Sequence, residues 1–126
     1  MVFDTNFLIC YAGQRKSLPR SRAIAFIKIH ADAPLYVSRV SAMEFAAGCP
    51  DDATAARHLT LFTILPVDEI IWDGATEIFR MLRKAGVRIG MADTLIAATA
   101  RRYGLPVVTN NTDDFAVVDG IQALGF

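Results

Sequence analysis

Short apolar runs alternate with longer helix-like segments along the whole chain, and this alternation limits the possible folds most strongly. Strands that alternate with helices indicate a parallel sheet with helices on both faces. Strands are expected at 1–3, 35–37, 64–67 and 106–109, with a weaker one within 116–124. Helices are expected after the first strand and near 19–31, from 38 or 41 to 48, over 51–62, from 71 to 86, and over 91–103. Pro66 favours an edge position for the third strand, because proline cannot donate to a central ladder.

Composition limits the class of protein. The 126 residues are 53% hydrophobic, which suits one domain spanning 1–126 with its own core. Thirteen basic and thirteen acidic side chains cancel, so nucleic-acid binding would need a local patch. The two cysteines, Cys10 and Cys49, form no CxxC motif, and reduced thiols in a cytoplasm are expected. The apolar runs are too short for a membrane span.

Four acidic sites are expected at one edge of the sheet. Asp4 ends the first strand, and Asp113 and Asp114 follow the fourth. Glu44 and Asp93 lie in first turns of helices that start at the same carboxyl edge, where open α/β sheets bind ligands. Two like charges at about 4 Å repel by roughly 4 kcal/mol at an effective dielectric of 20. The acids are therefore either separate structural caps or a divalent-metal site.

Each acid also has a structural interpretation. Asp4 fits an Asx turn or an N-cap of the following helix. Ser41 and Glu44 have the spacing of a capping box, whereas an N-cap at Ser38 would leave Glu44 free to project into the site. Asp93 suits the positive end of its helix dipole. The acids at 113 and 114 fit an ordinary turn.

Four motifs in order resemble a PIN domain, and their spacing is similar to that of VapC-type toxin ribonucleases. The motifs are Asp4-Thr5-Asn6, Ser41-Ala42-Met43-Glu44-Phe45, the helix from Asp93 to Ala100, and Thr109 to Phe115. The resemblance implies a three-layer α/β/α fold around a central parallel sheet of four to five strands. It also implies that four carboxylates are catalytic metal ligands, namely Asp4, Glu44, Asp93 and Asp114. Supporting residues that orient ligands or water would be Thr5, Asn6, Thr109, Asn111 and Asp113.

A site of oxygen ligands favours Mg²⁺, with Mn²⁺ as a substitute. His30 and His58 are isolated, so no histidine cluster indicates zinc. The expected reaction is hydrolysis of an RNA phosphodiester by metal-activated water. The resemblance further implies a structured RNA such as tRNA or rRNA, a homodimer, and a cognate antitoxin, for which a helical hairpin over 53–84 is a candidate grip.

Basic side chains cluster in two stretches without acids, between Asp4 and Asp32 and between Glu77 and Asp93. Such side chains could contact phosphates, although solvated helix faces are an equal alternative. Candidate RNA contacts are Arg15, Lys16, Arg80 and Arg88. The aromatic rings that could stack on bases are Tyr11, Phe62, Trp72 and Phe79, although the helical spacing of Trp72 and Phe79 favours a core or interface position for these two.

Two other functions stay open. A catalytically silent PIN-like module that binds RNA or protein is favoured by Asn111, where some PIN domains carry an acid, and by the capping-box reading of Glu44. A metal-dependent phosphatase is more remote, because no second aspartate lies two residues after Asp4.

Overall fold

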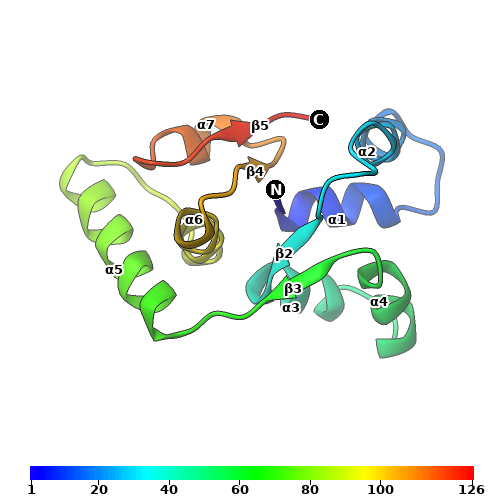
Figure 1. Cartoon of the computed structure of the whole chain (residues 1–126), viewed down its shortest axis with the longest axis horizontal. Coiled ribbons are helices and arrows are strands. Elements are labelled where there is room, and N and C mark those ends of the chain that lie inside the picture. The colour runs from blue at the N-terminus through cyan, green and yellow to red at the C-terminus, as the bar shows by residue number, and fades with distance from the viewer.

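A five-stranded parallel sheet forms the centre of the computed structural model, which describes residues 1–126. Its strand order is β3-β2-β1-β4-β5, so β1 is central and β3 and β5 are the edges (Figure 1). The strands are β1 (Val2–Phe3), β2 (Tyr36–Ser38), β3 (Thr63–Leu65), β4 (Val107–Val108) and β5 (Ala123–Leu124). The parallel sheet and the edge position of the third strand are confirmed.

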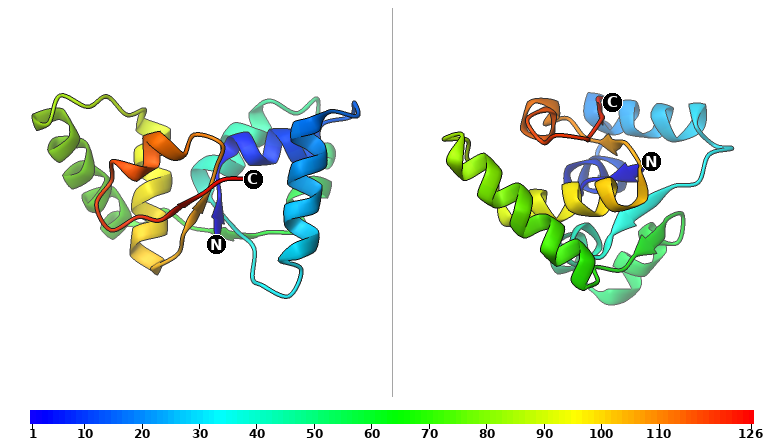
Figure 2. Two further views of the ribbon diagram at one scale, coloured as in Figure 1. Left: turned by 90° about the horizontal axis from the view of Figure 1, so that it is seen from above. Right: turned by 60° about the vertical axis from the view of Figure 1, so that its left-hand side comes forward.

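Seven helices connect and cover the strands. They are α1 (Thr5–Ala12), α2 (Leu18–Ile29), α3 (Arg39–Ala47), α4 (Asp52–Leu59), α5 (Glu69–Lys84), α6 (Met91–Tyr103) and α7 (Thr112–Ala116). Figure 2 shows α5 and α6 on one side of the strands and α1 and α2 on the other. The α/β/α arrangement expected from the alternation is therefore confirmed.

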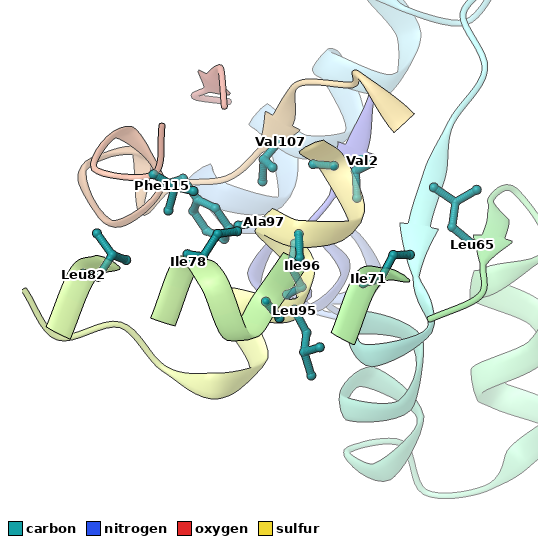
Figure 3. Packing of buried hydrophobic residues seen from close by; sticks show 14 residues of the cluster. Val2, Leu65, Ile71, Ile78, Leu82, Leu95, Ile96, Ala97, Val107 and Phe115 are labelled. Atoms are coloured by element: carbon teal, nitrogen blue, oxygen red, sulfur yellow. The ribbon is translucent and has the colours of Figure 1, made fainter. Parts of the chain in front are cut away.

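Successive strand residues point to opposite faces of the sheet and so build two cores. Val2 and Val107 face α5 and α6, where Ile78, Ile96 and Phe115 fill the space between the helices (Figure 3). The neighbouring residues of β1 and β4 face the other way, into the second core. That core holds Phe3, Phe7, Val37, Phe45, Phe62 and Val108.

Local capping explains where most helices begin and where α6 ends. The side chains of Ser17, Asp51 and Asp68 each accept a hydrogen bond from a backbone N–H in the first turn of α2, α4 and α5. Gly104 ends α6 in the left-handed conformation, with φ of 63°, that glycine adopts without a steric penalty. None of the helices is both long enough and apolar enough to cross a membrane.

Four details of the expected structure are wrong. Residues 113–115 belong to the helix α7, and only Ala123–Leu124 of the stretch 116–124 is a strand, because Val118 packs into the core from the turn after α7. Residues 53–84 are not a helical hairpin, since β3 separates α4 from α5. The third strand ends at Leu65, so Pro66 follows the ladder instead of lying within it.

Candidate active site

The candidate site lies at the carboxyl edge of the sheet, beside the switch point between β1 and β4. The chain runs from β1 through β2 to β3 on one side and then crosses to β4 on the other side of β1, and open α/β sheets bind ligands outside the strand ends at such a point. Asp4 follows β1 directly and Thr109 follows β4. The N-terminus of α6 reaches the same edge because α6 runs back antiparallel to β4.

Asp4 is 2% exposed and is held by two hydrogen bonds. Its Oδ1 accepts from the backbone N–H of Phe7 at 2.8 Å, which makes Asp4 the N-cap of α1. Its Oδ2 accepts from the Thr109 hydroxyl at 2.6 Å, across the switch point. The Thr109 oxygen accepts in turn from the N–H of Asn111 at 2.9 Å. Asp4 is thus both a cap and a fixed carboxylate at the site.

Glu44 is free of the capping box. The N-cap of α3 is Ser38, whose Oγ accepts from the N–H of Ser41 at 3.1 Å. Ser41 is itself inside the helix, so the capping-box interpretation of Ser41 and Glu44 is wrong. The Glu44 carboxylate accepts a hydrogen bond from the hydroxyl of Thr5, on the first turn of α1. Thr5 follows Asp4 in the chain, so this bond holds Glu44 at the same edge of the sheet as Asp4.

Asp93 and Asp114 lie in the first turns of α6 and α7. Asp93 is half-buried, whereas Asp113 and Asp114 are exposed. Neither helix has a side-chain N-cap bond. The structure therefore offers two acids in open positions beside the two acids that hydrogen bonds hold in place.

The acids affect one another electrostatically. Burial raises the pKa of Asp4 above its ordinary value of 3.8, the bonds from Thr109 and Phe7 oppose the rise, and the charges of Asp93 and Glu44 add to it. Burial also raises the pKa of Asp93, and the charges of Asp114 and Glu44 add to that rise. No basic side chain contributes to either shift. Four carboxylates thus share one field without a protein cation among them.

This donor set fits a hard divalent cation. Carboxylate oxygens are the ligands that Mg²⁺ and Mn²⁺ prefer, and a cation would offset both the burial and the repulsion that raise the pKa values of Asp4 and Asp93. No three acidic, histidine or cysteine side chains stand close enough, as they lie, to hold an ion between them. Binding would therefore require some of the carboxylates to turn inward. Asp93 and Asp114 can do so most easily, because no hydrogen bond fixes them.

The remaining predicted residues take different places. Thr5, Thr109 and Asn111 contact the carboxylates directly or through one hydroxyl, as described above. Asn6 and Asp113 are exposed. Of the neighbouring acids Asp113 and Asp114, only Asp114 affects the pKa of Asp93. The four candidate RNA contacts are all exposed, namely Arg15, Lys16, Arg80 and Arg88.

The aromatic candidates divide into two groups. Phe62 is buried in the second core, and Tyr11 packs against it with ring centroids 6.1 Å apart. Trp72 and Phe79 are 50% and 42% exposed, so they are surface residues and not core residues. They line an apolar cavity of about 280 Å³ between α5 and the start of α6 together with Arg80.

Two features of the site region were not expected from the sequence. The Cys10 thiol has a raised pKa through burial and through the charge of Asp4, so it lies close to the site. Gln14 and His58 line a groove of about 360 Å³ whose wall includes Glu44. Only the packing of α3 and α4 beside α1 brings these residues together, and no local pattern indicates it.

Comparisons with known proteins show which family this chain belongs to. The family model described as PIN domain matches residues 1–121. Ribonuclease VapC10 of Mycobacterium tuberculosis is 33% identical over 93 residues, which cover 72% of this chain and 70% of the relative. The tRNA(fMet)-specific endonuclease VapC of Shigella flexneri is 31% identical over 93 residues, which cover 68% of this chain and 70% of the relative.

A solved structure agrees over nearly the full length. A chain in a toxin–antitoxin complex from Klebsiella pneumoniae superposes with a TM-score of 0.73 and 26% identity, covering 95% of this chain and 93% of that one. The family match, the two relatives and the shared fold of the solved structure agree with one another. The chain belongs to the PIN domain family.

Proposed function

We propose that this protein is a metal-dependent endoribonuclease and the toxin of a toxin–antitoxin pair. The observation that carries the proposal is the gathering of four carboxylates at one edge of the sheet, where Glu44 and Asp93 act on the charge of Asp4 and Asp114 acts on that of Asp93. Such a group is costly without a cation and useful with one. The similarity to VapC ribonucleases supports the same reaction.

Mg²⁺ or Mn²⁺ held by these carboxylates would supply an activated water and would neutralise charge on the leaving oxygen. The chain contributes the positioning. The hydroxyl of Thr109 holds Asp4 Oδ2, and the backbone of Asn111 holds that hydroxyl. Thr5 holds Glu44. These bonds keep two carboxylates aimed before any substrate arrives, which lowers the reorganisation that the reaction requires.

RNA is the substrate that the similarity supports, and a structured RNA such as tRNA is our specific expectation because the Shigella flexneri relative is named for a tRNA. The exposed basic residues Arg15, Lys16, Arg80 and Arg88 would contact phosphates without reading sequence. With a net charge of zero, such contacts act locally and do not create a basic field over the whole molecule.

An antitoxin is the expected protein partner, because the similar chain from Klebsiella pneumoniae was solved in a toxin–antitoxin complex. A homodimer and a cytoplasmic location complete the proposal. The exposed apolar side chains of α5, Trp72 and Phe79, are candidates for a protein contact.

Cleavage of total bacterial RNA by the purified, partner-free protein tests the proposal. Reactions with Mg²⁺ or Mn²⁺, with EDTA, and with the Asp93→Asn variant would run in parallel. Discrete fragments that depend on the metal and on Asp93 are expected. No cleavage together with no Mn²⁺ uptake would instead support a catalytically silent binding module. The observation in favour of such a module is that no three of the carboxylates lie close enough together to hold a metal ion.

A further inference from the structure

A groove outside the carboxylate group leads away from Glu44. It has a volume of about 360 Å³ and lies between the last turn of α1, the second half of α3 and α4. Small-molecule sites have volumes of roughly 300–1,000 Å³, so one nucleoside can enter. Ile9, Phe45 and Pro50 give it apolar walls, and Gln14, Thr54 and His58 give it polar atoms.

We propose that this groove binds the base of a nucleotide next to the scissile phosphate, and that Gln14 and His58 read that base. The proposal rests on the proposed ribonuclease activity and adds a specificity site to it. The first argument is continuity. Glu44 lines the groove and is one of the four carboxylates, so the groove and the carboxylate group meet at this residue.

The second argument is the state of the two polar side chains. Within the chain, neither the Gln14 amide nor the His58 ring makes a hydrogen bond. The His58 ring is nevertheless positioned, since it lies edge-on to Phe45 at 6.0 Å and to Tyr11 at 6.4 Å. Amide and imidazole groups can pair with the donors and acceptors on the edge of an unstacked base.

The third argument is charge. Arg15 and Lys16 follow Gln14 in the chain, and Arg57 precedes His58, so three exposed cations are next in sequence to residues that line the groove. The nearby acid Asp51 caps α4 by accepting from the Thr54 N–H at 2.7 Å. Cations next in sequence to the groove residues suit the phosphates on either side of a bound base, and the proposal therefore commits to RNA as the occupant.

Two readouts test the inference with matched controls. The variants are Gln14→Ala and His58→Ala, and the controls are Gln122→Ala and His30→Ala, which change the chain's other glutamine and other histidine away from the groove. Cleavage of a random-sequence RNA pool, mapped at each position, is expected to show a base preference at one flanking position. The two groove variants should weaken it about three- to tenfold, the effect of one lost hydrogen bond. The controls should keep it.

The second readout needs no catalysis. RNA carrying 4-thiouridine is irradiated with the wild-type protein in EDTA, and the crosslinked peptides are identified. Crosslinks at residues 9–14 or 49–58 are expected, and they should fall in the two groove variants. Crosslinks there without cleavage would refute the nuclease activity and leave the base site standing. Cleavage with unchanged base preference in both variants, or crosslinks only elsewhere, would overturn the base site. A protein segment would then be the better occupant.

Discussion

The two halves of the carboxylate site differ in how firmly the fold holds them. Asp4 is 2% exposed and bound by Phe7 and Thr109, and Glu44 is bound by Thr5. Asp93 and Asp114 instead project from first turns that lack a side-chain cap. We call the first pair the fixed half and the second pair the open half.

This difference indicates a division of labour. The fixed half joins Asp4, where β1 ends, to Glu44 of α3 through Thr5 of α1, so folding alone sets its geometry. The open half depends on α6 and α7, whose acids can turn toward an entering cation. A site with both parts can hold a preset pair of ligands and still adjust to the ion, because only the open half has to move.

The largest effect is expected from the fixed half. Asp4→Asn removes a charge and breaks the bond from the Thr109 hydroxyl, whose oxygen already accepts from Asn111. Cleavage should fall by roughly 1,000-fold or more, because a metal ligand and its electrostatic contribution are lost together. Initial rates on a fixed RNA measure this. Activity within tenfold of the wild type would mean that Asp4 is only a helix cap.

A smaller loss is expected when the support of Asp4 is removed. Thr109→Val keeps the shape and deletes the hydroxyl, so metal affinity or rate should fall by about 10- to 100-fold. The Thr109→Ser variant, which keeps the hydroxyl, should retain most of the metal affinity and rate. The matched control is Thr99→Val, since Thr99 is also buried but donates to the Leu95 carbonyl away from the site. Equal losses in the two valine variants would show a packing effect only.

The open half should distinguish its two adjacent acids. Asp114→Asn is expected to lower activity by about tenfold, and Asp113→Asn by less than twofold, because only Asp114 adds to the pKa of Asp93. Rates measured across a Mn²⁺ titration separate binding from turnover. A larger loss from Asp113 would reverse the assignment. A loss from Asp114 as large as that from Asp4 would remove the distinction between the halves.

The smallest expected effect is on stability. Asp4 and Asp93 have raised pKa values in the folded protein, so between 3.8 and those values the folded state binds more protons than the unfolded state. The free energy of unfolding without metal should therefore decrease as pH rises through that window. The Asp93→Asn variant should melt roughly 2–4 °C above the wild type at pH 7. Below pH 3 the variant and the wild type should have the same melting temperature. A lower melting temperature at pH 7 would mean that Asp93 stabilises the fold.

Much of the fold could be predicted from the sequence because local chemistry determines it. Apolar runs marked the strands, and Gly104 marked the end of α6. The prediction for the last segment was wrong for a physical reason. Residues 116–124 are apolar enough for a strand, yet tertiary packing of Val118 sets a turn there and leaves two residues to pair with β4. Similarly, both Ser38 and Ser41 could cap α3, and only the folded chain distinguishes them.

The acids of the site could be located in advance because parallel strands bring their carboxyl ends to one edge. The hydrogen-bond partners of these acids could not be located in advance. The bond between Thr109 and Asp4 joins residues 105 positions apart, and the bond between Thr5 and Glu44 spans 39 positions. Those contacts depend on strand order, which puts β4 beside β1. His58 was interpreted as isolated for the same reason, although it lines a groove with Glu44.

The most direct test of the central claim is a crystal structure of the Mn²⁺-soaked protein, with anomalous scattering to locate the metal. The account predicts a peak at the switch point, in contact with the Asp4 and Asp93 carboxylates, with Asp93 turned inward and Asp4 still bonded to Thr109. No peak at that edge under saturating Mn²⁺, or a peak that leaves Asp4 untouched, would contradict it.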